Sequence, residues 1–120
     1  MHYTSLKVAD IERSGRFYDS ILAPLGWRRQ EESELAIGWG LQRSVFFIET
    51  DGDTPRPGFG HVSFRGRSIP AVKASHESGM LNGGESAADP GSAPLRGTGS
   101  YCARLTDPDG YLVQIVVAPD

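Results

Sequence analysis

At 120 residues, the chain is short enough for one compact domain and long enough for a hydrophobic core. Its 12 basic and 15 acidic residues are interspersed and give a net charge of −3, so we expect neither a nucleic-acid nor a membrane partner. The single cysteine, Cys102, excludes an internal disulfide, and the amino terminus has no apolar signal region. These features favour a soluble, cytoplasmic globular protein.

The first half of the chain has the pattern of a strand, a helix and further strands. Residues 3–8 alternate in polarity, which places Tyr3 and Ser5 on the face of a strand that points away from the core. Asp10 can cap a helix whose apolar positions recur at helical spacing as far as Gly26. Three further strands are predicted over 27–32, 34–39 and 44–49.

The pattern starts again after a linker over 51–58, which is rich in Gly and Pro. A strand over 59–65 puts His61 and Ser63 on its polar face. Ser68 can cap a second helix, because a proline follows in its first turn. The apolar face of that helix is predicted to carry Ile69, Val72 and Met80.

The last part of the chain is predicted to hold a short strand, a loop and a hairpin, over 85–88, 89–100 and 101–117 respectively. The hairpin turn is Asp-Pro-Asp-Gly at 107–110, residues that suit a β-turn. In the final strand, Gln114 is the only polar residue between Leu112 and Val117. Because an unpaired buried amide costs about 1–3 kcal/mol, Gln114 needs a partner in a polar pocket or on a ligand.

A strand–helix–strands unit therefore occurs twice, and Ser5 in the first strand corresponds to Ser63 in the second. This predicts one α+β domain over 1–120, with module 1 over about 1–50 and module 2 over about 59–120. A ferredoxin-like α/β dimer is the alternative, but it would place two strands around each helix rather than one before and three after.

Four segments in this order resemble the vicinal oxygen chelate superfamily, the glyoxalase/bleomycin-resistance/dioxygenase group. They are LKVADIERSGRFY at 6–18, APLG at 23–26, GHVSF at 60–64, and DPDGY at 107–111 followed by Gln114. The resemblance covers essentially the whole chain. It implies two βαβββ modules whose sheets form an open cup, commonly in homodimers.

In enzymes of this family, a divalent metal (Zn, Ni, Mn or Fe) lies in the cup, held by the first and last strands of each module. The corresponding residues of this chain are Tyr3, Glu49, His61 and Gln114. Tyr3 and Gln114 depart from the family's pattern, because a phenol and a neutral amide are weaker ligands than histidine and carboxylate. The metal ligands that the resemblance makes possible are His61, Glu49 and Gln114.

Glu49 and His61 are the candidate catalytic residues, because a carboxylate and an imidazole can both move protons. The candidate ligand-binding residues are Tyr3, Ser5, Phe47, Ser63, Tyr101 and Gln114. For Tyr101, packing with a backbone hydrogen bond is the competing interpretation.

Three functions remain open from the sequence. The first is a metal-assisted lyase or isomerase of the lactoylglutathione-lyase type. The second is a metal-free protein of the bleomycin-resistance type, which sequesters a small aromatic or cationic compound. The third is a non-catalytic structural dimer. A homodimer is expected in each case, because two half-cups leave sheet edges that need covering.

Overall fold

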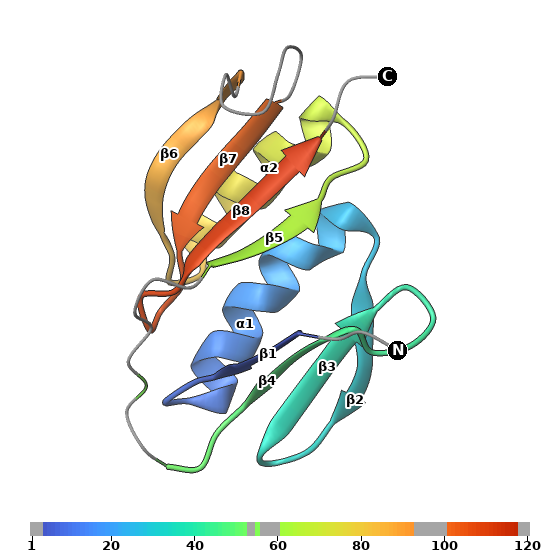
Figure 1. The fold of residues 1–120 in the computed structure, drawn as a ribbon, viewed down its shortest axis with the longest axis vertical. Helices are drawn as coiled ribbons and strands as arrows, with labels where there is room; N and C mark the ends of the chain where they lie inside the picture. Colours follow the sequence, from blue (N-terminus) through green and yellow to red (C-terminus); the bar gives the residue numbers. More distant parts are fainter. Residues whose placement is uncertain (1–3, 53–54, 56–60, 93–100, 118–120) are drawn as a thin grey trace.

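The computed structural model describes residues 4–52, 55, 61–92 and 101–117. It contains two βαβββ units, drawn one above the other in Figure 1. The predicted repeat is therefore confirmed, and the ferredoxin-like alternative is excluded because each helix follows one strand and precedes three. The limits set for the domain and its modules stay a prediction, and most of the linker over 51–58 lies outside the described residues.

The first unit forms a four-stranded sheet, called sheet A here, with strand order β1-β4-β3-β2. β1 and β4 are parallel, and the other neighbours are antiparallel. Its elements are β1 (Thr4–Lys7), α1 (Ile11–Leu22), the 3₁₀ helix η1 (Ala23–Leu25), β2 (Arg28–Glu32), β3 (Ala36–Gly40) and β4 (Phe46–Glu49).

The second unit forms sheet B, with the matching strand order β5-β8-β7-β6. Again the first and last strands, β5 and β8, are parallel neighbours at one side of the sheet. Its elements are β5 (His61–Arg65), α2 (Ile69–Leu81), β6 (Glu85–Ser92), β7 (Tyr101–Thr106) and β8 (Leu112–Val117).

Both helices begin at the predicted caps. The Asp10 carboxylate accepts hydrogen bonds from the backbone N–H groups of Glu12 and Arg13, and the Ser68 hydroxyl accepts one from Ala71. Gly26 follows η1 with φ of 86°, a left-handed conformation that glycine adopts without strain. Local sequence signals are therefore sufficient to set these helix ends.

Two sequence predictions in the second unit are wrong. The segment from Asp89 to Ser92 continues β6 and is not a loop, because two register shifts let the strand stay paired with β7. In α2, Ile69 and Met80 are 45% and 42% exposed, and small or polar residues face the core with Val72. These are Ser75, His76 and Gly79. α2 packs closely on α1, so bulky side chains do not fit there.

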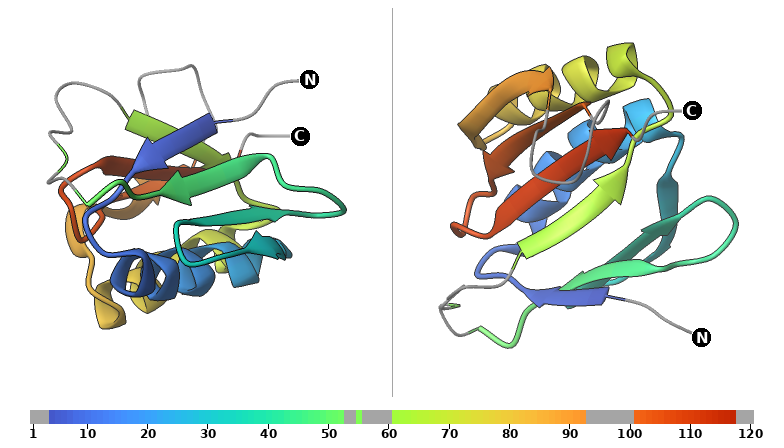
Figure 2. Two further views of the ribbon diagram at one scale, coloured as in Figure 1. Left: turned by 90° about the horizontal axis from the view of Figure 1, so that it is seen from below. Right: turned by 45° about the horizontal axis from the view of Figure 1, so that its top comes forward.

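One hydrophobic core joins the two units. The helices lie side by side beneath both sheets (Figure 2, left), and each sheet turns its apolar face toward them. Phe46 of β4 meets Phe64 of β5 edge to face, with ring centroids 5.0 Å apart. The opposite faces of sheets A and B, called the polar faces here, therefore point away from this core.

The 107–110 turn fastens the second unit to α1. The buried Asp107 carboxylate accepts the Tyr18 hydroxyl at 2.6 Å and the backbone N–H groups of Asp109 and Tyr111 at 2.9 Å. Burial raises the pKa of Asp107, although these hydrogen bonds oppose the rise. Burial also raises the pKa of Tyr18, and the neighbouring carboxylate adds to that rise. None of the described helices is both long and apolar enough to cross a membrane.

Candidate functional site

The polar face of sheet B carries three rows of side chains across β5, β8 and β7. Strand alternation buries Val62, Phe64, Val113 and Ile115 in the core and turns their neighbours outward. Register then aligns the outward residues, giving the rows His61–Leu112–Thr106, Ser63–Gln114–Arg104 and Arg65–Val116–Cys102. His61 thus lies on the polar face, as predicted from the alternation, and Gln114 shares that face.

The middle row is a hydrogen-bonded chain. Arg104 Nε donates to Gln114 Oε1 at 3.0 Å, and Gln114 Nε2 donates to Ser63 Oγ at 3.4 Å. The amide of Gln114 therefore has the partner that its position required. Because Nε is engaged, the guanidinium of Arg104 is held in a defined orientation. Among the described residues, its two terminal nitrogens have no hydrogen-bond partner.

Tyr101 lies on the other side of β7. Its ring packs partly buried against the core, on the same face as Ala103 and Leu105. Arg104, and not Tyr101, is on the face that carries Gln114. Tyr101 is therefore not brought together with His61, Ser63 and Gln114.

The polar face of sheet A brings together the predicted residues of the first unit. Ser5 pairs with Phe47, and Lys7 pairs with Glu49, across the parallel strands β1 and β4. Ser5 and Glu49 are exposed, and Phe47 is half-buried. Tyr3, the fourth predicted residue of this half, lies outside the described residues.

A cavity of about 680 Å³ opens on this face of sheet A. It is lined by Ser5, Glu31, Ala36, Arg43, Ser44, Phe47 and Glu49. Every one of these residues comes from sheet A or from the turn between β3 and β4. Its volume falls in the range of small-molecule sites, which is about 300–1,000 Å³.

The turn between β3 and β4 shapes this cavity. Gly40 lets the backbone fold back on itself, because a Cβ there would lie 1.7 Å from the carbonyl oxygen of Arg43. Val45 N–H then closes the turn on the carbonyl oxygen of Trp39 at 2.8 Å. Ser44 is thereby brought over Gly38, where only a residue without a side chain leaves room for it.

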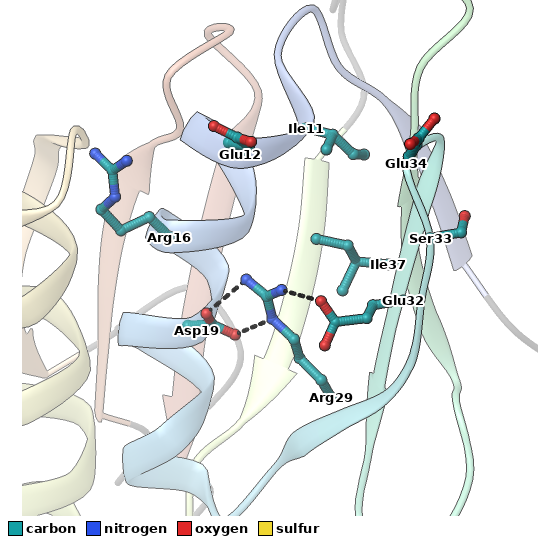
Figure 3. A pocket seen from close by; sticks show the side chains of 9 residues that line it. All are labelled: Ile11, Glu12, Arg16, Asp19, Arg29, Glu32, Ser33, Glu34 and Ile37. Atoms are coloured by element: carbon teal, nitrogen blue, oxygen red, sulfur yellow. Dashed lines mark hydrogen bonds and ion pairs between the residues drawn. The ribbon is translucent and has the colours of Figure 1, made fainter.

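A larger hollow of about 860 Å³ lies elsewhere, between α1 and β2. Figure 3 shows the Arg29 guanidinium between two carboxylates, those of Asp19 at 2.7 Å and Glu32 at 3.2 Å. The indole N–H of Trp39 also donates to Asp19 at 2.9 Å. The polar groups at its centre thus bind one another, and the hollow contains none of the predicted site residues.

The residues present do not fit a divalent metal at the predicted position. Gln114 Oε1, the atom that would ligate the ion, already accepts a hydrogen bond from the cationic Arg104 side chain. A metal there would displace a guanidinium and then lie beside its charge. Among the described residues, no three His, Cys, Asp or Glu side chains lie close enough together to hold an ion.

Two residues of these faces were missed from the sequence. Arg104 could have been found from the alternation of β7, where Ala103 and Leu105 are apolar and Arg104 lies between them. Ser44 carried no such signal, because its position depends on the backward fold of the turn at Gly40.

Residues 1–115 match the model of the Glyoxalase/Bleomycin resistance protein/Dioxygenase superfamily, and the chain belongs to this superfamily. The predicted fold class, two βαβββ modules of this type, is thereby confirmed. The chain is 27% identical to a glyoxalase/bleomycin resistance protein from Albidiferax ferrireducens, whose crystal structure superposes with a TM-score of 0.85 over 99% of this chain and 98% of that one.

Two further comparisons concern a sequence relative and a solved structure with the same fold. The chain is 26% identical to lactoylglutathione lyase from Salmonella typhimurium, over 98% of this chain and 92% of the lyase. It also has the fold of the fosfomycin resistance protein FosX from Mesorhizobium loti, with a TM-score of 0.69 at 13% identity, over 99% and 92% of the two chains. Similarity at these levels does not extend to a specific activity.

Proposed function

We propose that this protein binds a small organic molecule on the polar faces of its sheets, and that Arg104 recognises an oxygen-rich group of that molecule. The observation that carries the proposal is the chain Ser63–Gln114–Arg104 on sheet B. It supplies a fixed positive charge close to the position where the family's pattern expects a metal ligand. The divalent metal that the resemblance made possible is not part of this proposal.

The geometry of Arg104 favours a carboxylate or a carbonyl oxygen as its partner. A guanidinium offers parallel N–H donors that match the two oxygens of a carboxylate. The side chain is half-buried, so its hydrogen bonds would be screened less than those of an exposed arginine. Orientation by Gln114 reduces the entropy lost when a ligand binds.

Phenylacetate and its neutral analogue phenylacetamide test this proposal by calorimetry. We expect the wild type to prefer phenylacetate, and Arg104→Gln to lower its affinity by about tenfold or more, since a hydrogen bond to a charged group contributes about 1.5–3 kcal/mol. Arg65→Gln is the matched control, because Arg65 is an exposed cation one row away on the same face. Equal losses in both variants would reduce the effect to general electrostatic attraction and contradict the proposal.

The second candidate function is a lyase of the lactoylglutathione-lyase type, with Glu49 and His61 as acid–base residues. The similarity to lactoylglutathione lyases favours it. We expect protein purified without chelators to contain less than stoichiometric Zn, Ni, Mn or Fe, and turnover of the hemithioacetal of glutathione and methylglyoxal to be absent. Stoichiometric metal that is lost in both Glu49→Ala and His61→Ala, together with turnover, would favour the lyase instead.

We also propose that the protein is a cytoplasmic homodimer. The cavity on sheet A and the row on sheet B come from different sheets of one chain, and each sheet ends in two edge strands. A second copy could cover such edges and bring a sheet A next to a sheet B. Light scattering should give twice the mass of 13.0 kDa. A monomeric mass at working concentration would contradict the dimer.

A further inference from the structure

The cavity on sheet A is lined by a buried hydroxyl group that makes no hydrogen bond to any described residue. Ser44 is 8% exposed, and its Oγ has no hydrogen-bond partner among the described residues. A buried polar group without a partner costs free energy, and most such groups in proteins are paired. A hydroxyl kept in this state at the wall of a cavity therefore points to a ligand that supplies the missing hydrogen bond.

The position of this hydroxyl is fixed by its surroundings. Ser44 follows the closed turn at Gly40, and it lies over Gly38 beside the ring of Phe47. A Cβ built on Gly38 would be 2.5 Å from Ser44 Oγ and 2.7 Å from Phe47 Cε2. The three residues thus meet at one point, at the wall of the cavity that Ser44 and Phe47 both line.

The rest of the cavity specifies the chemistry of the ligand. Ala36 and the half-buried ring of Phe47 form an apolar wall that suits an aromatic ring. Glu31, Glu49 and Arg43 are exposed and line the same cavity. Two carboxylates against one guanidinium make this part of the cavity attractive to a cationic group.

We propose that this cavity binds an aromatic ring that carries a hydroxyl group, with that hydroxyl bonded to Ser44 Oγ and an amine placed near Glu31 and Glu49. Ser44 would then be a residue that determines specificity, because a ligand without the hydroxyl leaves the serine unpaired. The inference rests on the proposed function, since it adds a second recognition point for a small molecule. It concerns sheet A, whereas Arg104 lies on sheet B.

Stability measurements on two serine variants form the first arm of the test. Without ligand, Ser44→Ala should leave the melting temperature unchanged or raise it, because the substitution removes a desolvated hydroxyl that has no partner in the described part of the chain. The matched control is Ser75→Ala. Ser75 is fully buried and donates to the carbonyl oxygen of Ile21 at 2.7 Å, so its loss should lower the melting temperature. Equal falls in both variants would assign Ser44 a structural role and overturn the proposal.

Binding of tyramine and phenethylamine forms the second arm, since the two amines differ only in the phenolic hydroxyl. The wild type should bind tyramine about tenfold more tightly, as expected for one hydrogen bond of about 1.4 kcal/mol. Ser44→Ala should bind both amines equally, with the affinity for phenethylamine unchanged. Equal binding by the wild type, binding of neither amine, or a preference that survives in Ser44→Ala would each overturn the proposal.

The two proposals fail in different measurements. If Arg104→Gln weakens phenylacetate binding while Ser44→Ala leaves the tyramine preference intact, the proposed function stands and the Ser44 subsite is wrong. If the tyramine preference depends on Ser44 but Arg104→Gln leaves phenylacetate binding unchanged, the subsite stands and the proposed role of Arg104 is wrong.

Discussion

The polar faces of sheets A and B come from the same βαβββ pattern, yet they satisfy their polar groups in opposite ways. On sheet B, Ser63, Gln114 and Arg104 bond one another across three strands. On sheet A, Ser44 Oγ is buried at a cavity wall without a partner among the described residues. Duplicated backbone topology therefore fixes where the faces lie, whereas the side chains decide whether the polar groups of a face bond one another or stay without a partner among the described residues.

The largest expected effect is a loss of folding stability that weakens ligand binding at both polar faces. Asp107→Ala removes the acceptor of three hydrogen bonds and leaves the buried Tyr18 hydroxyl without its partner. The free energy of unfolding should fall by about 3 kcal/mol, which urea denaturation can measure. Because Asp107 ties the second unit to α1, binding at both faces should weaken together. Unchanged stability would show that the turn does not hold the two units in place.

Gly38→Ala should abolish ligand binding on sheet A without affecting binding on sheet B. The added Cβ would meet Ser44 Oγ at 2.5 Å and Phe47 at 2.7 Å, so both side chains must move. Overpacking of this kind costs about 1–3 kcal/mol in the free energy of unfolding. We expect tyramine binding to be lost and phenylacetate binding to be retained, as measured by calorimetry. Loss of both would mean that the faces are not independent.

Gln114→Ala should weaken ligand binding on sheet B and leave binding on sheet A unchanged. Arg104 can reach water when Gln114 is removed, so the loss in stability should stay within about 1 kcal/mol. Phenylacetate affinity should still fall by several-fold, because the guanidinium is no longer oriented. Tyramine binding is the internal control and should not change. A fall in stability without a fall in affinity would reduce Gln114 to a structural residue.

The smallest expected effect is a dependence of folding stability on pH through Asp107. The pKa of Asp107 in the folded protein is raised above its ordinary value of 3.8, so the folded state holds this proton more tightly than the unfolded state. Its contribution to stability is fully present below 3.8 and is lost as pH rises through the raised pKa. Relative to Asp107→Asn, the free energy of unfolding of the wild type should therefore fall as pH rises from 3.8 through the raised pKa of Asp107. A difference that is constant with pH would contradict the raised pKa.

Short-range patterns were enough to predict most of the fold. Alternation placed His61 and Ser63 on the polar face of β5, and caps at Asp10 and Ser68 set the helix starts. The extension of β6 through Ser92 was missed, because a segment containing Pro and Gly joins a strand only where its partner accepts register shifts. The exposed Ile69 and Met80 were missed because close packing of α2 on α1 favours small residues.

By itself, the sequence determined the two βαβββ modules, the superfamily and the face on which His61, Ser63 and Gln114 lie, because strand alternation and helix caps are local properties. Only the tertiary structure decided that Arg104 is the partner of Gln114 and that Ser44 Oγ is buried with no partner among the described residues. The first depends on register between strands that are distant in the chain, and the second on a turn folding back over Gly38. Such non-local contacts define the chemistry of the two faces.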